Sequence, residues 1–508
     1  MQIKKWKIFL IIVVLVLSAS LTAITLYIMN ARISAYPYDT ELDYSYDFKG
    51  TDAQILNLYL KNQKFTLPIL NECPSTHKNS GSKTHNCSHQ TRPLSYSAFL
   101  KIKINSTFMG KFFQPEVKLS ANKLSISEYF ETGSQGIRYI NISALVGSEK
   151  DGVEIILKGR RVRFKDQQIQ LILFKNKDIA KSKILIIAPH PDDAEIAAFG
   201  IYSSNRNSYI VTVTAGDAGT YQYDEIYSNR KNHFLKKGKI RTWNSIAVPL
   251  LSGIPPEQIL NLGFFDGTLK TMFEVNPSNV KALYTGITNI DIFRKQNISP
   301  LVNLLEGGTN WNGLVKNLEL ILKEIEPDII VAPYPALDKH PDHKFSSIAL
   351  FEAIKKAGIR SGSLYLYTNH FVLNEYYPYG NAGGVISPPP FFSQDTISPP
   401  SFFFQDNFFP QDKIYFKSLY SHHLSDDRQK DKILSLEAMN DLRPDTTWRF
   451  SEDAIKMAVA SIRRDIMGQN ISYYRRAVRN NELFFVVDIN DVYDRYILKC
   501  ITGQDYMP

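Results

Sequence analysis

Two hydrophobic patterns divide most of the chain. From about residue 48 to 178, apolar and polar residues alternate with a period of two, for example at 99–105 and 139–143. Such alternation is typical of short strands with one buried face, and it predicts a small all-β, sandwich-like domain. From about 179 to 490, continuous apolar runs such as 184–188 alternate with helical stripes. This second pattern predicts an α/β domain built on a Rossmann-like parallel sheet.

The elements expected in the α/β domain can be placed by residue number. Its strand candidates are 184–188, 209–214, 329–333, 364–368 and 482–487. Apolar positions within 314–325 and within 455–462 fall on single helical faces. Stripes of this kind pack against a core, so we expect both helices to cover the sheet.

The N-terminus carries a long apolar stretch. Residues 8–29 are 22 uncharged and mostly apolar residues, enough to cross a bilayer as a helix. Lys4, Lys5 and Lys7 precede this stretch, which predicts a cytoplasmic N-terminus by the positive-inside rule. A cleaved signal peptide is the alternative, but its apolar region is usually only about 7–15 residues long. We therefore expect an uncleaved anchor at 1–30 and a single-pass membrane protein whose folded domains are extracytoplasmic, either periplasmic or at the cell surface.

Three further segments show neither pattern. Residues 31–47 are expected to be a linker, and 491–508 a C-terminal tail. Residues 376–412 interrupt the α/β domain with Phe, Pro and Gln-Asp repeats. This insertion is too long for an ordinary loop, which indicates either a functional lid or partial disorder.

Cys73 and Cys87 bracket a polar loop within the β-rich region. In an extracytoplasmic domain, two cysteines so placed predict a disulfide. Histidines at 77, 85 and 89 make a second metal site the less favoured alternative, because their spacing matches no standard zinc module.

Composition changes this picture only slightly. The 508 residues are 44% apolar and 21% charged, as in globular proteins. The net charge of +9 is spread along the chain. No segment resembles a nucleic-acid module, so we expect no nucleic-acid partner, and the surplus charge mildly favours an anionic membrane or an acidic glycan nearby.

Polar side chains follow two of the apolar runs where each predicted strand ends. The first cluster consists of His190, Asp192 and Asp193. The second cluster consists of Asp338, His340, Asp342 and His343. Because open α/β sheets place their ligand sites at the carboxyl ends of strands, we expect both clusters to meet in one crevice.

Together the clusters hold the groups that a metal-dependent hydrolase needs. His190, Asp193 and His343 supply two imidazoles and one carboxylate, the ligand set of a catalytic zinc site. Asp192 and His340 remain as a base and an electrophile. The structural alternative is that Asp192 or Asp193 caps the following helix, with His190 bonded to a backbone carbonyl.

These motifs resemble the PIG-L/LmbE family of zinc-dependent N-acetylglucosamine deacetylases. In chain order they are His190-Pro-Asp-Asp-Ala-Glu195, the loop 214–220, Leu262-Gly-Phe-Phe-Asp-Gly267 and His340-Pro-Asp-His343. Arg241 matches the Arg of the family's Arg-x-x-Glu helix, although Asn244 stands where Glu is usual, and Asp217 replaces a Glu. The resemblance is close over about 182–372 and looser over 412–487.

The resemblance implies a mechanism with Zn²⁺ as cofactor. His190, Asp193 and His343 are expected to hold the metal, and Asp192 is expected to be the general base. A protonated His340 is expected to stabilise the oxyanion.

The remaining polar residues are expected to support the metal ligands or the substrate. Asp338 and Asp342 are candidates for orienting the histidines from behind. The family suggests that Arg241 and Asp266 contact sugar hydroxyls or a phosphate.

The expected reaction is removal of the N-acetyl group from an N-acetylglucosamine-type sugar in a glycan or glycolipid. One alternative is a zinc amidase that acts on another acylated amine. The other is a catalytically inactive, membrane-anchored glycan-binding protein, which the complete set of motif ligands disfavours.

Overall fold

The structure is a computed structural model that describes residues 2–68, 95–148, 152–221, 226–392, 414–439 and 473–504. Four predictions lie outside the described residues: the Cys73–Cys87 disulfide, the alternative metal site at 77, 85 and 89, the helical stripe at 455–462 and positions 393–412 of the insertion.

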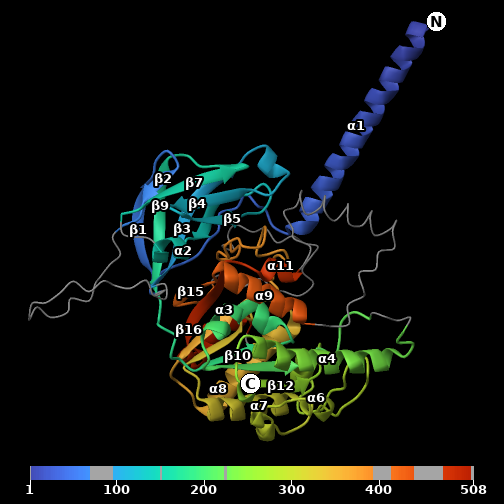
Figure 1. Cartoon of the computed structure of the whole chain (residues 1–508), viewed down its shortest axis with the longest axis vertical. Helices are drawn as coiled ribbons and strands as arrows, with labels where there is room; N and C mark the ends of the chain where they lie inside the picture. The colour runs from blue at the N-terminus through green and yellow to red at the C-terminus, as the bar shows by residue number, and fades with distance from the viewer. Residues whose placement is uncertain are drawn as a thin grey trace, which may run out of the picture.

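The first described element is helix α1 (Gln2–Ala35), which extends away from the rest of the chain (Figure 1). It covers the stretch 8–29 that was expected to span a membrane. Within the described part of the chain, however, no helix is long and apolar enough to cross a bilayer. The membrane location stays a prediction.

Residues 36–47, expected to be part of a linker, are packed against the described start of the insertion. Tyr44 and Tyr46 are buried. The Tyr46 hydroxyl donates to the carbonyl oxygen of Pro389 over 2.6 Å, and the ring centroids of Tyr46 and Phe391 lie 5.8 Å apart. This part of the insertion therefore contributes to a hydrophobic core rather than standing free in solvent.

Two antiparallel sheets follow α1 in the chain (Figure 1). The first has the order β1 (Gln54–Leu60), β9 (Gln167–Lys175), β3 (Tyr96–Ser106) and β6 (Gln135–Asn141), with β8 (Val162–Arg163) paired to β3. The second has the order β2 (Lys64–Thr66), β7 (Glu154–Arg160), β4 (Glu116–Ala121) and β5 (Leu124–Tyr129). Leu100 of the first sheet and Leu119 of the second share one core. A short helix, α2 (Ser143–Ser148), lies in the same region.

A seven-stranded sheet forms the centre of the rest of the molecule. Its order is β12 (Ile259–Phe264), β11 (Ser208–Thr214), β10 (Ile184–Ala188), β13 (Ile329–Pro333), β14 (Ser363–Tyr367), β16 (Asn481–Asp488) and β15 (Ser418–His423). All five predicted strands are present within one or two residues of their expected bounds. The prediction of a parallel sheet is wrong at β16, which pairs antiparallel with both of its neighbours. An apolar run carries no information about strand direction, so the sequence pattern could not reveal this reversal.

The described residues of this α/β region form the helices α3 (Asp193–Ser204), α4 (Arg230–Leu251), α5 (Leu269–Glu274), α6 (Asp291–Arg294), α7 (Trp311–Ile325), α8 (Pro341–Ala357), α9 (Asp426–Ala438), α11 (Tyr473–Ala477) and α12 (Arg495–Thr502). Helix α7 confirms the predicted stripe at 314–325, since its apolar residues are buried. Asn310 caps this helix by accepting a hydrogen bond from the Gly313 N–H over 2.8 Å.

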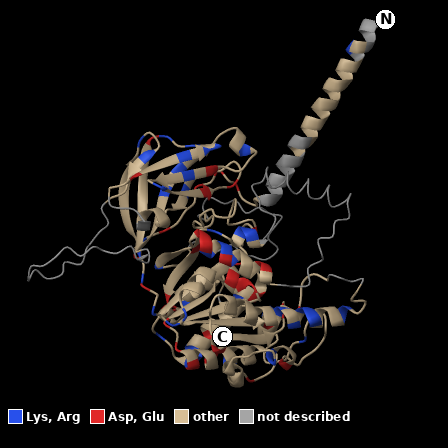
Figure 2. Ribbon diagram, viewed as in Figure 1, with Lys and Arg blue, Asp and Glu red and all other residues tan. Residues whose placement is uncertain are grey.

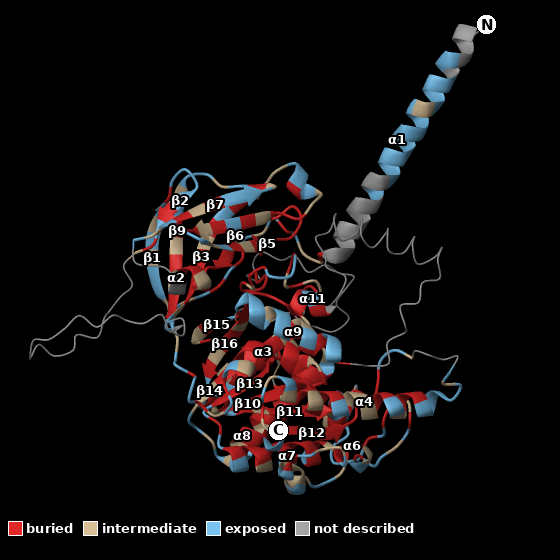
Figure 3. Cartoon of the chain, viewed as in Figure 1, coloured by how far each residue is buried: buried red, intermediate tan, exposed pale blue. Residues whose placement is uncertain are grey.

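Successive residues of the central strands face opposite helical layers. Ile184 of β10 shares a core with Phe199 of α3. Leu185, the next residue, belongs to the core on the other face together with Leu318 of α7. The sheet is therefore buried on both faces (Figure 3), as a predominantly parallel sheet requires. Its neighbouring strands β10 and β13 end side by side, which brings the two polar clusters together.

Candidate metal centre

The first cluster lies in a tight turn between β10 and α3. The carbonyl oxygen of Pro189 accepts from the Thr214 hydroxyl over 2.9 Å, which fixes the start of the turn to the neighbouring strand. Asp192 has φ 115° and ψ −23°, a conformation that costs a residue with a side chain about 1–3 kcal/mol. Asp192 occupies the N-cap position of α3, yet its side chain makes no capping hydrogen bond. Helix capping therefore does not explain this residue.

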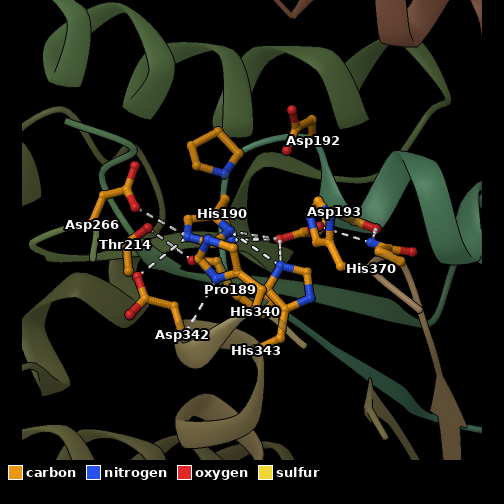
Figure 4. A network of polar contacts seen from close by, with 12 residues as sticks. Pro189, His190, Asp192, Asp193, Thr214, Asp266, His340, Asp342, His343 and His370 are labelled. Atoms are coloured by element: carbon orange, nitrogen blue, oxygen red, sulfur yellow. Dashed lines mark hydrogen bonds and ion pairs between the residues drawn. The ribbon is translucent and has the colours of Figure 1, made fainter. Parts of the chain in front are cut away.

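Three atoms of the two clusters form a nearly equilateral triangle (Figure 4). His190 Nδ1 lies 3.1 Å from Asp193 Oδ2 and 3.2 Å from His343 Nε2. The third side, from His343 Nε2 to Asp193 Oδ2, is 3.1 Å. A tetrahedral zinc ion with bonds of about 2.0–2.1 Å holds its ligand atoms about 3.3 Å apart. The triangle therefore fits zinc.

In both His190 and His343, the ring nitrogen outside this triangle faces a carboxylate. His190 Nε2 lies 3.2 Å from Asp266 Oδ1 and 3.3 Å from Asp342 Oδ2. His343 Nδ1 lies 2.9 Å from Asp338 Oδ2. Protons held at these positions leave the lone pairs of His190 Nδ1 and His343 Nε2 directed at one another and at Asp193. Converging lone pairs repel unless a cation lies between them.

Comparison with known proteins gives a family for this part of the chain. Residues 185–354 match the model of a family described as PIG-L, GlcNAc-PI de-N-acetylase. These residues form a PIG-L domain. The family predicted from the sequence is thus confirmed, and so is the enzyme class, an N-deacetylase hydrolase.

No curated protein matches the chain. Among solved structures, the A40926 pseudoaglycone deacetylase Dbv21 is 14% identical, with a TM-score of 0.30, covering 61% of this chain and 98% of its own. The zinc-inhibited form of teicoplanin deacetylase Orf2 is 13% identical, with a TM-score of 0.29 and coverages of 60% and 98%. GalB, a 4-carboxy-2-hydroxymuconate hydratase from Pseudomonas putida, is 11% identical, with a TM-score of 0.28 and coverages of 60% and 96%.

Burial and charge set the protonation of the PIG-L site. Burial raises the pKa of Asp192 to about 6, although Arg241 acts in the opposite direction. Burial disfavours a charged His343, but Asp193 and Asp338 outweigh it and raise the pKa of His343 to about 10. The excess of carboxylates around the two metal-facing rings therefore favours a cation at this centre.

His340 differs from the protonated residue expected from the resemblance. Burial, together with His190 and His343, lowers the pKa of His340 to about 4. Its Nδ1 accepts a hydrogen bond from the Asp342 N–H over 3.2 Å, at the N-terminus of α8. The proton of a neutral His340 therefore resides on Nε2, which makes that atom a hydrogen-bond donor.

The structure brings the residues predicted for the metal, for catalysis and for the substrate into one region, but gives two of them unexpected partners. Asp266, expected at the substrate, contacts His190 Nε2. Arg241 Nη2 donates to the carbonyl oxygen of Pro191 over 2.6 Å and lies 3.3 Å from Asp192 Oδ2. Both residues thus support the metal and base residues, and contacts with a substrate stay a prediction.

Three residues near the centre were missed by the sequence analysis, and all lie outside the matched residues 185–354. Asn369 Nδ2 donates to Asp193 Oδ1 over 2.8 Å. The ring centroid of His370 lies 5.0 Å from that of His343. The Tyr474 hydroxyl lies 3.0 Å from Asp192 Oδ2. Asn369 and His370 follow the predicted strand at 364–368 and could have been found as a third strand-end cluster, whereas no pattern marks Tyr474.

Proposed function

We propose that this chain is a zinc-dependent hydrolase that removes the N-acetyl group from an N-acetylglucosamine-type sugar in a glycan or glycolipid. The observation that supports it most is the triangle of His190 Nδ1, Asp193 Oδ2 and His343 Nε2, with sides of 3.1–3.2 Å. Two imidazoles and one carboxylate leave further coordination positions for water and substrate. Zinc, when bound, supplies Lewis-acid activation of water and of the amide carbonyl.

Asp192 is the proposed general base. Its pKa of about 6 leaves the carboxylate mostly unprotonated at neutral pH, so that it can take a proton from the attacking water. The new C–O bond forms at the acetyl carbon and the C–N bond then breaks. Asp192 returns the proton to the departing nitrogen, so that the products are acetate and the free amine of the sugar.

His340 is the proposed donor to the oxyanion. Since its Nδ1 accepts from the Asp342 N–H, its Nε2–H is the group available to the negative charge that develops on the acetyl oxygen. A neutral donor suffices for this role, because a hydrogen bond to an anion is already strengthened by that anion's charge.

A zinc amidase for a larger acyl group is the second candidate, and a pocket beside the centre favours it. Asn369, which donates to Asp193, also lines this pocket. Its apolar lining includes Ile196, Ala197, Tyr367, Ile386 and Phe485. Such a wall suits the alkyl part of an acyl chain. Hydrolysis rates along a series of N-acyl glucosamines separate the two candidates, since the first predicts the fastest reaction with acetyl.

The proposed setting is a membrane, with the N-terminus in the cytoplasm and the PIG-L domain outside it. The three lysines before the apolar stretch 8–29 support this orientation. A glycolipid or a surface glycan would then be within reach of the enzyme.

The test of the proposed function uses the full chain with a panel of free and lipid-linked N-acetylated sugars. Acetate release and the appearance of a free amine are measured for the wild type and for Asp192→Asn. We expect hydrolysis by the wild type, and a variant that retains zinc but loses most of the turnover. A wild type that is loaded with zinc and inactive on every sugar would contradict the proposal.

A further inference from the structure

Tyr474 reaches the active site from a part of the chain far outside the matched family region. It lies on α11, 282 residues after Asp192, and its hydroxyl is 3.0 Å from Asp192 Oδ2. Only 6% of Tyr474 is exposed. Its ring belongs to a small hydrophobic core with Val248 of α4 and Leu436 of α9. These contacts hold the ring in place, so the direction of the hydroxyl is set by packing.

The carboxylate of Asp192 is held by side chains from other helices rather than by its own helix. Its left-handed conformation is unfavourable, and the carboxylate makes no bond to the first turn of α3. Two side chains approach it instead, Arg241 at 3.3 Å and Tyr474 at 3.0 Å. Arg241 is itself fixed by its bond to the Pro191 carbonyl oxygen.

Both contacts fall on the same carboxylate oxygen. Arg241 and Tyr474 meet Oδ2 of Asp192. Among the described residues, no hydrogen bond or ion pair to Oδ1 is present. A carboxylate with one oxygen held by a hydrogen bond and an ion pair has the other oxygen available as a proton acceptor.

We propose that Tyr474 is a positioning residue for the general base: with Arg241 it holds Oδ2 of Asp192, so that Oδ1 is presented to the attacking water. This inference rests on the proposed role of Asp192. It implies that a complete active site requires α11, because residues 185–354 contain the metal ligands and the base but not this donor.

The test combines Tyr474→Phe with Asp192→Asn in the full chain. Removing the single hydroxyl should lower kcat about tenfold, as expected for loss of one hydrogen bond to a charged group, with KM and zinc content unchanged. Tyr46→Phe is the matched control, since that buried hydroxyl donates to the Pro389 carbonyl oxygen, away from the metal centre and its pocket. In the Asp192→Asn background, Tyr474→Phe should have no further effect on the residual rate.

Two outcomes would overturn the inference. A normal kcat in Tyr474→Phe would mean that the hydroxyl does not position the base. An equal loss in the Asp192→Asn background would mean that Tyr474 acts on the substrate or on the fold.

Crystal structures of the wild type and Tyr474→Phe add a readout that is independent of turnover. We expect the Asp192 carboxylate to rotate in the variant while His190, Asp193 and His343 stay in place. An unmoved carboxylate would contradict the inference, even if no substrate of the wild type were found. A moved carboxylate in a wild type without activity would uphold it and count against the proposed function alone.

Discussion

A substitution at Asp338 is the sharpest mutational test of the metal centre. Its carboxylate is fully buried and accepts four N–H groups. The Oδ2 atom accepts from His343 Nδ1 at 2.9 Å and from the backbone N–H groups of Asn369 and His370 at 3.2 Å each. The Oδ1 atom accepts from the His340 N–H at 2.9 Å.

Asp338→Asn keeps the shape of the side chain but not this set of acceptors. If the amide nitrogen takes the place of Oδ1, it faces the His340 N–H. If it takes the place of Oδ2, it faces the three other N–H donors. At least one buried donor is left unsatisfied, which costs about 1–3 kcal/mol. The bond to His343 also loses its charged acceptor. Loss of such support behind a metal ligand typically weakens metal binding about 10–100-fold.

Zinc affinity is measured by competition with a chromophoric chelator, and the stability of the metal-free protein by urea unfolding. We expect Asp338→Asn to bind zinc about 10–100-fold more weakly and to lose about 1–3 kcal/mol of stability. The control is Asp494→Asn, because Asp494 caps α12 through the Ile497 N–H at 2.9 Å and Asn caps a helix equally well. If Asp338→Asn bound zinc as tightly as the wild type, the tautomer assigned to His343 would be wrong.

Further predictions concern pH and topology. Activity should fall as the pH drops through about 6, where Asp192 gains a proton; a pH–rate profile that is flat down to pH 5 would exclude Asp192 as the base. In the metal-free protein the pKa of His343 is raised from 6.5 to about 10, so its stabilising charge is fully present below pH 6.5. This contribution to stability is lost as the pH rises toward 10. Urea unfolding across that pH range would detect the loss, and a stability that does not change would contradict the prediction. A reporter fused after Pro508 should be active outside the cytoplasm, and activity only inside it would refute the orientation.

The site could be predicted from the sequence where metal-binding residues directly follow the end of an apolar strand. The runs at 184–188 and 329–333 are apolar throughout, which is the mark of strands buried on both faces. Since neighbouring parallel strands end at one edge of the sheet, the meeting of His190, Asp193 and His343 could be predicted before any distance was known.

What could not be predicted depends on tertiary packing. The direction of β16 is not encoded in its apolar run. Asp266 was expected at the substrate because its motif indicates a site residue, but only the fold determines that it faces His190. The contact of Tyr474 with Asp192 depends on the packing of α11 against α3 and α9, over a separation at which sequence pattern carries no information.

The resemblance also predicted a different protonation state for one residue. His340 was expected to be protonated, yet burial lowers its pKa, and so do the neighbouring His190 and His343. Its N-cap bond to the Asp342 N–H then determines which nitrogen carries the proton. A sequence cannot give either the burial or the neighbours on which this assignment depends.

Restoration of activity by zinc tests the central claim most directly. The full chain is stripped of metal with a chelator, zinc is added back in steps, and acetate release from an N-acetylglucosaminyl substrate is recorded at each step. We predict no release from the stripped protein and a linear recovery that ends at one zinc per chain. Acetate release that persists without metal, or that zinc fails to restore, would contradict the account.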